Sequence, residues 1–331
     1  MTVVQELPTP ALVVDADAFD HNLAAMAAAL PGERCRPHVK AHKTLALARE
    51  QAARGHRAFT CATPREMEGM AKAGLGEDLL LANEVVDPDR LRRLAELDGH
   101  VTIAVDSQAT IDAAVRAGLE EVVIDVFVGM PRCGCPVERA GPLADAARAR
   151  GLGARGVMGY EGHVVGVADR ATREEQTEAA MRMLLDAHAD VGGELVSGGG
   201  TGTFDINTWV TEIQAGSYAL MDTAYDQLDL PFRQALSIVA TVISVSEGWA
   251  VADCGLKALG MDHGDPTVIG HTVWYCSDEH VTFGPGSAVT VGDQVRVVPA
   301  HVDPTVAYHE RLHLARGEEI VDTWAVDLRG W

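Results

Sequence analysis

The feature that most constrains the fold of this chain is a regular alternation of short β-type runs and longer helical stretches through its first two-thirds. The β-type runs are rich in Val, Ile and Leu, whereas the stretches between them carry Ala, Leu and Arg at amphipathic spacing. Such alternation is typical of βα units and a parallel sheet. The strand-like runs are 11–15, 36–40, 58–62, 78–82, 100–106, 121–128, 154–161, 194–197 and 212–220, and the helical stretches are 18–30, 44–54, 64–73, 88–96, 107–118, 136–150 and 170–190.

The number of strand-like runs predicts a closed barrel. Nine runs are present where a (β/α)8 barrel takes eight strands, and the count agrees if residues 11–15 stand outside the barrel or pair with the C-terminal domain. We take 36–40 as the first barrel strand and 212–220 as the last. Thr63-Pro64 and Asp87-Pro88 each place a capping residue before a Pro that fits the first helical turn. We therefore expect a TIM-type (β/α)8 barrel over residues 1–229.

The pattern changes near residue 230, where the helical spacing ends. Residues 236–253, 268–276, 287–298 and 318–327 have the composition of β-strands, with turn signals such as Gly284-Pro285-Gly286 between them. No long helical stretch separates these runs. We therefore expect a small all-β domain over residues 230–331, so that the chain is an α/β barrel followed by a β-domain.

Charge and hydropathy limit the partners of the chain. Its formal net charge of −21 disfavours nucleic-acid binding, which depends on clustered Lys and Arg. No apolar run approaches the ~20 residues of a membrane-spanning helix, and residues 1–15 lack the basic start and apolar core of a signal peptide. The six cysteines are expected as reduced thiols, including the pair Cys133 and Cys135. We expect a soluble cytoplasmic protein.

Polar residues and glycines gather where the barrel strands are expected to end. In TIM barrels the active site forms at the C-terminal ends of the strands. Any one polar residue there could be an ordinary loop residue, whereas their concentration at one barrel mouth indicates an active site. The residues concerned are Lys40 with His38 and His42, Asn83, Asp106, Arg132, Tyr160 to His163, Ser197 to Thr203, and Gly216 to Tyr218.

Lys40 is the strongest single candidate among these residues. Only three other lysines are present, Lys43, Lys72 and Lys257, so a lysine-dependent mechanism is easy to locate. Alternation along a strand would send His38, Lys40 and His42 in one direction. A lysine at the last inward position of a barrel strand is partly desolvated, which suits it to form an imine. The alternative is a phosphate-binding or surface lysine, which is less favoured because lysine normally avoids strand interiors.

The segment Ser197-Gly-Gly-Gly-Thr-Gly-Thr203 follows the seventh barrel strand. Glycine-rich turns expose backbone N–H groups that can hold a phosphate, and Gly216-Ser217 at the next strand end could add further donors. Glycine-rich loops are common, so the signal is weak by itself. The chain has neither a Walker sequence nor a G-x-G-x-x-G turn in a strand–helix unit, which disfavours an NTPase or a dinucleotide enzyme.

Two histidine patterns lie near the C-terminus. On an extended segment, His301-Val302-Asp303 would present an imidazole and a carboxylate on one side, a partial site suited to Zn or Mn. Such pairs also arise by chance. His309-Glu310-Arg311-Leu312-His313 matches the H-E-x-x-H pattern of zinc proteases, but that pattern requires a helix and this segment has the composition of a hairpin arm. We expect no protease site there.

Together these motifs resemble the D-threonine aldolase and D-serine dehydratase family of pyridoxal-phosphate (PLP) enzymes, which has the alanine-racemase-like fold. The similarity runs nearly the whole length, and the co-occurrence of R-P-H-x-K-x-H-K with H-x-D-P-T is its most specific element. The matching segments are 8–11 (PTPA), 36–43 (RPHVKAHK), 160–163 (YEGH), 197–201 (SGGGT), 212–218 (EIQAGSY), 253–257 (DCGLK), 277–280 (SDEH) and 299–305 (PAHVDPT).

The resemblance implies a PLP site at the barrel mouth. Lys40 would carry the cofactor as a Schiff base, Arg132 would approach its phenolic oxygen, and Gln214 would face its pyridine nitrogen. A neutral partner at that nitrogen would weaken the electron sink and limit racemisation. The remaining cofactor-binding residues implied by the resemblance are Tyr160, Ser197, Gly199, Gly200, Thr201, Gly216, Ser217 and Tyr218.

The resemblance also implies a divalent metal, Mn, Zn or Mg, at His301 and Asp303, where it would engage the β-hydroxyl of the substrate. The implied reaction is retro-aldol cleavage of a D-threonine-like D-3-hydroxy amino acid to glycine and an aldehyde. His163 or a metal-held water would remove the hydroxyl proton. The alternative is a D-serine or D-3-hydroxyaspartate dehydratase that yields a 2-oxo acid and ammonia. Asp303 favours the aldolase, because dehydratases commonly have Cys at that position.

Two further expectations concern assembly and a rival class. Enzymes of this fold usually form homodimers in which each β-domain approaches the barrel mouth of its partner, so a homodimer is expected. A non-catalytic PLP carrier with a single barrel domain is the rival from another class. The additional β-domain with His301 and Asp303 argues against a carrier, since a carrier needs no metal.

Overall fold

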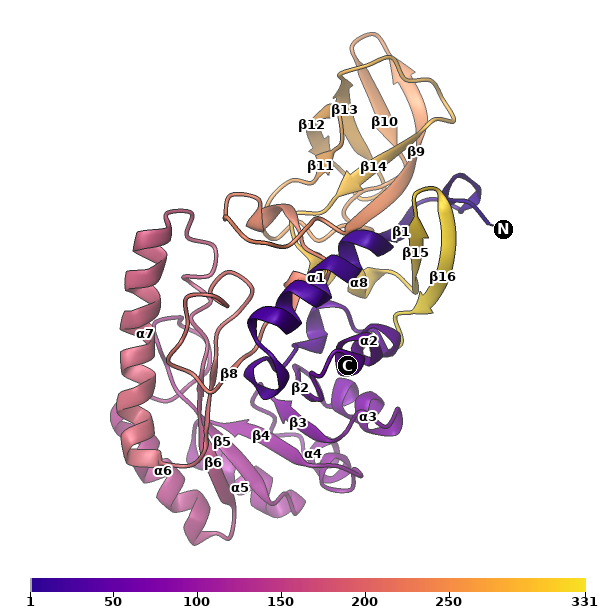
Figure 1. Ribbon diagram of the computed structural model, residues 1–331. Coiled ribbons are helices and arrows are strands. Elements are labelled where there is room, and N and C mark those ends of the chain that lie inside the picture. The colour runs from indigo at the N-terminus through magenta and orange to yellow at the C-terminus, as the bar shows by residue number, and fades with distance from the viewer. Residues whose placement is uncertain (1) are drawn as a thin grey trace. The chain divides into compact units, whose positions relative to one another are not determined.

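The computed structural model describes residues 2–331, which form two compact units (Figure 1). The barrel unit comprises 26–40, 47–216 and 328–331, and the β unit comprises 2–25, 41–46 and 217–327. Helices α1 (Ala16–Ala29) and α2 (Leu45–Ala53) each continue along the chain from the β unit into the barrel unit. The expected domain boundary at 229 stays a prediction, because compactness does not itself establish which segment folds independently.

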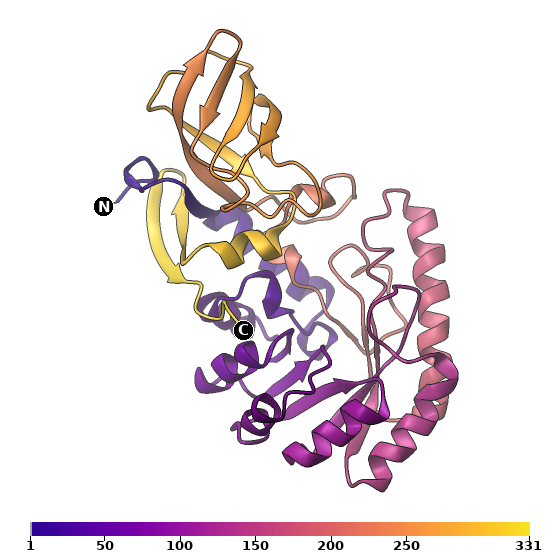
Figure 2. The same cartoon turned by 180° about the vertical axis from the view of Figure 1, so that it is seen from behind.

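The barrel unit contains a curved parallel sheet of seven strands in the order β2 to β8, with helices on its outer face (Figures 1 and 2). This arrangement confirms the predicted succession of βα units. The strands are β2 (Ala58–Cys61), β3 (Asp78–Leu81), β4 (Val101–Val105), β5 (Glu121–Asp125), β6 (Gly153–Gly159), β7 (Leu195–Gly198) and β8 (Glu212–Ile213). The helices are α3 (Pro64–Lys72), α4 (Pro88–Ala95), α5 (Gln108–Ala117), α6 (Val137–Ala149) and α7 (Arg170–Val191).

Residues 35–38 take the place of the eighth barrel strand, and we call them the closing segment. Cys35 forms a parallel bridge to Ile213 of β8, and His38 forms one to Thr60 of β2. The predicted strand at 36–40 is therefore shorter than expected. Pro37 has no N–H for a ladder, although its carbonyl accepts from Thr60 N at 3.0 Å. The chain then turns into the 3-10 helix η3 (Val39–Ala41), so Lys40 does not lie on a strand.

The helices begin where the cap residues predict. Thr63 Oγ1 accepts from the backbone N–H of Glu66, and the Glu66 carboxylate accepts from the backbone N–H of Thr63. Together the two bonds form a capping box before Pro64. Asp87 caps α4 in a similar way by accepting from the backbone of residues 89 and 90. These contacts satisfy N–H groups that the first turn of a helix leaves unpaired. Local sequence is thus sufficient to fix these helix starts.

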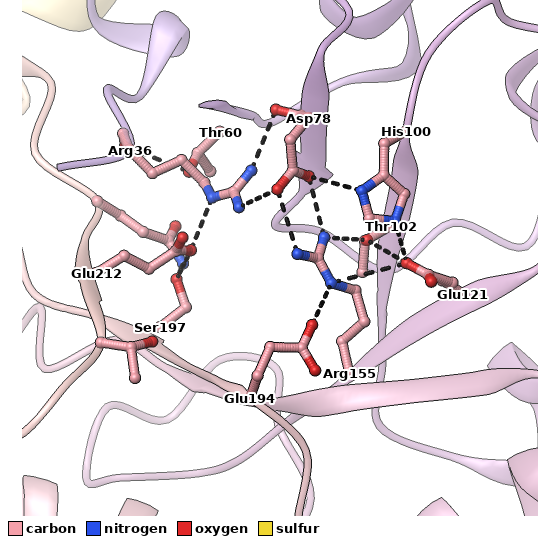
Figure 3. A network of polar contacts seen from close by, with 12 residues as sticks. Arg36, Thr60, Asp78, His100, Thr102, Glu121, Arg155, Glu194, Ser197 and Glu212 are labelled. Atoms are coloured by element: carbon pink, nitrogen blue, oxygen red, sulfur yellow. Dashed lines mark hydrogen bonds and ion pairs between the residues drawn. The ribbon is translucent and has the colours of Figure 1, made fainter. Parts of the chain in front are cut away.

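Two layers of side chains fill the barrel interior. Because side chains alternate along a strand, Asp78 and Leu80 of β3 point to the same face, the first in the polar layer and the second in the apolar layer. The apolar layer is a buried cluster of Leu80, Ala104, Val123, Met158 and Leu195. The polar layer lies at the N-terminal ends of the strands, and we call it the basal network; its members are Arg36, Asp78, Thr102, Glu121, Arg155, Glu194 and Glu212 (Figure 3).

The β unit contains a sheet in the order β12-β13-β10-β9-β1-β15-β16, with β14 pairing β9 and β11 pairing β14. Strand β1 (Ala11–Asp15) is antiparallel to β9 and parallel to β15, so it does not belong to the parallel sheet. The other strands are β9 (Leu236–Ser246), β10 (Trp249–Ala252), β11 (Thr267–Val268), β12 (His271–Cys276), β13 (Val281–Pro285), β14 (Gln294–Val298), β15 (Arg311–Arg316) and β16 (Glu319–Ala325).

Two elements of the β unit differ from expectation. Strand β13 lies where the sequence predicts a turn, because Gly284 and Pro285 occupy the end of a strand that pairs with β12 and β10. A short helix, α8 (Val302–Tyr308), interrupts the β-type runs, with Pro304 in its first turn. His301-Val302-Asp303 therefore spans a helix start, and it is not the extended segment that was predicted. Among residues 2–331, no helix is long and apolar enough to cross a membrane.

Candidate active site

Lys40 lies two residues beyond the C-terminal end of the closing segment, in η3. That segment is parallel to β8 and β2, so its end is on the same edge of the barrel as the C-terminal ends of those strands. The predicted position of Lys40 at the barrel mouth is therefore reproduced, but the alternation argument behind it is wrong. The 3-10 turn at Val39–Ala41 removes the period of two on which a shared direction for His38, Lys40 and His42 depended.

Loops after β5 and β6 bring Arg132, Tyr160 and His163 to the same edge. The guanidinium carbon of Arg132 lies 5.7 Å from the centroid of the Tyr160 ring, within the range of a cation–π contact. The exposed imidazole of His163 packs against Gly129, where a Cβ would lie 2.7 Å from its Cε1 atom. Gly129 also has a φ of 120°, so both backbone and space require glycine there. A glycine in one loop thus sets the position of the histidine in the next.

Two other predicted residues hold mouth loops in place. Asn83 donates from Nδ2 to the carbonyl of Ala62 at 3.0 Å, and Asp106 accepts from the backbone N–H of Gly134 at 3.3 Å. The buried carboxyl of Asp125 lies nearby, with a pKa raised well above its usual range by burial and by the charge of Glu84.

The glycine-rich loop after β7 is fixed by Glu161. This fully buried carboxylate accepts from the backbone N–H of Gly199 at 3.1 Å, from the hydroxyl of Thr203 at 2.8 Å and from the amide of Asn207 at 3.1 Å. Bonds to a charged acceptor are stronger than neutral ones, and three of them make Glu161 the main support of the loop. Within the Tyr160–His163 motif, Glu161 is therefore the residue that shapes a neighbouring loop.

The loop backbone requires glycine at two positions. Gly199 has a φ of 78°, and a Cβ there would lie 2.7 Å from Ile213 Cδ1. At Gly202 a Cβ would lie 1.8 Å from the carbonyl oxygen of Val165. The N–H groups of Gly199 and Gly200 already donate within the protein, to Glu161 and to Thr203 Oγ1. A phosphate at this loop would therefore use other donors of the 199–203 turn.

Ser197 and Gln214 lie deeper than the resemblance implies. The buried Ser197 hydroxyl donates to Glu212 Oε1 at 2.6 Å (Figure 3). It also accepts from Gln214 Nε2 at 2.8 Å, so both residues are joined to the basal network. The structure therefore does not bring the Ser197 hydroxyl to the phosphate loop. The Gln214 amide nitrogen carries a second N–H, and an N–H donor is what a neutral contact to an unprotonated ring nitrogen requires.

Gly216 ends the barrel unit, and Ser217 and Tyr218 begin the 3-10 helix η4 (Ser217–Ala219) of the β unit. The Tyr218 ring is fully buried and packs on Phe232, with the ring centroids 5.6 Å apart. Tyr218 is thus a core residue of the β unit in addition to any role in cofactor binding.

The basal network provides hydrogen-bond acceptors for the buried guanidinium of Arg36, at the opposite end of the barrel strands from Lys40. Arg36 donates from Nε to Glu212 at 2.7 Å and from Nη2 to Asp78 at 2.8 Å, and Arg155 donates to the other oxygen of Asp78 at 3.0 Å (Figure 3). Burial by itself would raise the pKa of Asp78, but hydrogen bonds and charges of the two arginines lower it to about 2. In a TIM barrel this end contributes stability and not chemistry.

His301 and Asp303 lie together at the start of α8. His301 occupies the N-cap position and Asp303 the first turn, and Nε2 of the imidazole lies 3.9 Å from Oδ1 of the carboxylate. Two atoms that bind one ion can be separated by at most the sum of their bond lengths, about 4.2 Å for nitrogen and oxygen on zinc. The pair therefore fits a single divalent cation, with the Asp303 side chain only 14% exposed.

The H-E-x-x-H segment is not a metal site of the protease type. His309 is the C-cap of α8, and His313 lies on β15, so no helix places the two imidazoles on one face. His309 instead contacts the carbonyl of Ala258, and His313 contacts Thr323. All six cysteines are free thiols, as expected.

Comparison with known proteins identifies the family. A family model described as the alanine racemase N-terminal domain matches residues 14–223, and one described as a putative serine dehydratase domain matches 235–315. The chain belongs to the family of D-threonine aldolases and D-serine dehydratases. The resemblance seen in the motifs is thereby confirmed.

Individual relatives cover nearly the whole chain. It is 35% identical to a D-threonine aldolase of an Arthrobacter species, over 98% of this chain and 93% of that protein. It is 34% identical, with the same coverage, to a 3-hydroxy-D-aspartate aldolase of Paracoccus denitrificans. The crystal structure of D-threonine aldolase from Filomicrobium marinum matches with a TM-score of 0.93 and 33% identity, over 99% of this chain and 97% of that one. The chain is thus a PLP-dependent lyase of the aldolase type.

The roles of three residues of the site were not predicted from the sequence. Glu161 was part of a recognised motif, but its three donors lie 38, 42 and 46 residues away. Gly129 carried no signal beyond its residue type. Asp262 contacts His301 from 39 positions earlier in the chain. A buried acid beside a glycine-rich loop is the pattern that could have pointed to Glu161.

Proposed function

We propose that this protein cleaves a D-threonine-like D-3-hydroxy amino acid to glycine and an aldehyde, with PLP linked to Lys40 and a divalent cation at His301 and Asp303. The observation that carries the proposal is similarity to two aldolases over 98% of the chain. The residues present fit both groups, because the mouth offers a lysine, an arginine and a glycine-only turn, and the start of α8 offers an imidazole and a carboxylate within reach of one ion.

PLP, when bound, stabilises negative charge at Cα of the substrate. Lys40 would hold the cofactor through Nζ, and Arg132 would donate to its phenolic oxygen. Gln214 would contact the ring nitrogen without adding charge. Glu161 would hold the loop whose backbone binds the phosphate, and Gly216, Ser217 and Tyr218 would add contacts at the next strand end.

His163 is the proposed base. An imidazole exchanges protons readily near neutral pH, and this one is exposed at the mouth and held by Gly129. It would take the proton from the β-hydroxyl of the substrate, so that the Cα–Cβ bond breaks as the aldehyde carbonyl forms. A cation at His301 and Asp303 would polarise the same hydroxyl.

Dehydration is the alternative reaction at the same groups. It is disfavoured because residue 303 is Asp, whereas the dehydratases commonly have Cys there. The purified protein, with PLP and Mn²⁺, is expected to convert D-threonine to glycine and acetaldehyde. Formation of 2-oxobutyrate and ammonia would establish the dehydratase. Removal of the metal by a chelator is expected to stop cleavage, and readdition of Mn²⁺ to restore it.

The substrate side chain is the finer part of the proposal, because the two aldolase relatives act on different amino acids. Parallel assays with D-threonine and 3-hydroxy-D-aspartate would rank the two by kcat/KM. A homodimer and a cytoplasmic location stay predictions, as do the other site residues of the resemblance.

Replacing Glu161 with Gln is expected to weaken PLP binding about tenfold. The substitution keeps the side-chain volume but replaces one carboxylate oxygen with an NH₂ group, which cannot accept from the donors of Gly199, Thr203 and Asn207. An unmade buried hydrogen bond of this kind costs about 1–3 kcal/mol. Titration of the apoprotein with PLP, followed by absorbance, measures the change. Glu175→Gln, on the exposed face of α7, is the matched control. Unchanged PLP affinity in Glu161→Gln would remove Glu161 from the cofactor site.

A further inference from the structure

The imidazole of His301 is held on two sides by residues of one short segment. Its Nδ1 atom lies 2.7 Å from Oδ2 of Asp262, and its ring stacks on that of His263, with centroids 3.9 Å apart and an interplanar angle of 10°. All three residues belong to the β unit. The edge contact fixes rotation of the ring in its plane, and the stack limits rotation out of it.

The segment that carries Asp262 is attached to the start of α8. Gly260 donates from its backbone N–H to Thr305 Oγ1 at 2.9 Å, and the Thr305 hydroxyl donates to the carbonyl of His301 at 2.7 Å. Gly260 and His301 also form an antiparallel bridge. A Cβ at Gly260 would lie 2.2 Å from Cγ of Pro304, so the close approach requires glycine. Asp262 is thus held beside His301 by backbone contacts, although its own side chain is 57% exposed.

The contact with Asp262 determines which imidazole nitrogen is available. A carboxylate oxygen accepts, so Nδ1 of His301 carries the hydrogen and donates it. Nε2 then presents a lone pair, and this is the nitrogen that lies 3.9 Å from Asp303 Oδ1. Metal-binding histidines commonly donate their other N–H to a carboxylate, which fixes the tautomer and the orientation of the ring.

We propose that Asp262 is the positioning residue of the metal ligand His301, holding it in the Nδ1–H tautomer with Nε2 toward Asp303. This inference rests on the proposed metal site. His263 serves as the stacking partner and not as a ligand, since its Nε2 lies 3.8 Å from Asp262 Oδ2 and its side chain is 49% exposed. The rival arrangement places the cation among Asp262, His263 and His301, whose ligand atoms all lie within 4.8 Å of one another.

Mn²⁺ titration of the PLP-loaded protein, followed by electron paramagnetic resonance, separates the two arrangements. Asp262→Asn is expected to weaken Mn²⁺ binding about 10- to 100-fold. His263→Phe is expected to change Mn²⁺ affinity by less than about threefold, because a phenyl ring keeps the stacking contact with His301 and removes only a nitrogen that does not bind the ion. His301→Ala provides the reference for loss of a ligand, and Asp265→Asn removes an exposed charge three residues from Asp262 as the matched control.

Imidazole ¹⁵N spectra of the histidine-labelled protein without Mn²⁺ supply a second readout. The signal that is missing in His301→Ala is expected to show the Nδ1–H tautomer in the wild type and to lose that signature in Asp262→Asn. Unchanged affinity and tautomer in Asp262→Asn would overturn this inference while leaving the metal site intact. Loss of Mn²⁺ in His263→Phe as complete as in His301→Ala would establish the rival arrangement. Failure of the wild type to bind Mn²⁺ would overturn the metal site and this inference together.

Discussion

Replacing Lys40 with Ala is expected to lower kcat for D-threonine cleavage by at least about 10³-fold, the scale on which loss of a principal catalytic group is felt. Lys40 follows the closing segment directly, in η3, and its Nζ atom is the proposed point of covalent attachment of the cofactor. The visible absorption band of bound PLP is expected to disappear together with the activity. Steady-state assays and absorption spectra of the purified variant measure both effects.

Lys72→Ala is the matched control for this variant, because Lys72 is an exposed lysine at the end of α3 in the same unit. Its kcat and spectrum are expected to equal those of the wild type. A Lys40→Ala protein that kept a PLP band resistant to dialysis and cleaved D-threonine at the normal rate would contradict the assignment.

Replacing Arg36 with Leu is expected to lower the free energy of unfolding by about 3–5 kcal/mol, because it leaves the buried carboxylate of Glu212 without its ion-pair partner and leaves Asp78 with Arg155 as its arginine partner. The Arg36 side chain is 2% exposed and bonds to both Asp78 and Glu212. For a domain of this size, the loss corresponds to a fall in melting temperature of roughly 6–20 °C. Calorimetry or thermal circular dichroism measures it.

Arg92→Ala is the control for the loss of an arginine, since Arg92 pairs with Asp89 on the exposed surface of α4. Exposed pairs contribute about 0–1 kcal/mol, so its melting temperature should shift little. An Arg36→Leu protein as stable as Arg92→Ala would show that the basal network does not stabilise the barrel.

The basal network also predicts a loss of stability in acid. The pKa of Asp78 is about 2 in the folded protein, against 3.8 as the ordinary value. A lowered folded-state pKa stabilises the protein above the unfolded value, and the contribution disappears as the pH falls from about 4 to about 2. The shift corresponds to roughly 2 kcal/mol, and Asp78→Asn is expected to flatten this part of the stability profile.

Local patterns were sufficient for the helices and most barrel strands. Capping at Thr63 and Asp87 depends on neighbours within three or four residues, so the sequence contains the whole signal. The strand predicted at 36–40 was too long, because Pro37 interrupts the ladder and the chain turns at Val39. Composition does not show this effect of backbone geometry. Helix α8 was missed because seven residues carry too little periodicity.

The candidate site was predictable only in part, because contacts between residues far apart in the sequence hold it together. Lys40, His301 and Asp303 stood out by residue type and spacing. Arg132 and His163 were among the polar residues at the expected strand ends, and the resemblance implied their roles. The interactions that hold these residues join distant positions, such as Arg36 with Glu212 across 176 residues. Ser197 has the right composition for a phosphate loop, yet its hydroxyl is used by Glu212 and Gln214 inside the barrel.

The assignment of the cofactor to Lys40 is tested most directly by locating the cofactor on the chain. Reduction of the PLP-loaded protein with borohydride makes the carbon–nitrogen bond to lysine permanent, and mass spectrometry of the digested protein then identifies the modified residue. Since the chain has only four lysines, the result is unambiguous. If Lys40 holds the cofactor, a single pyridoxyl adduct on Lys40 is expected. An adduct on Lys43, Lys72 or Lys257, or no adduct at all, would contradict the assignment.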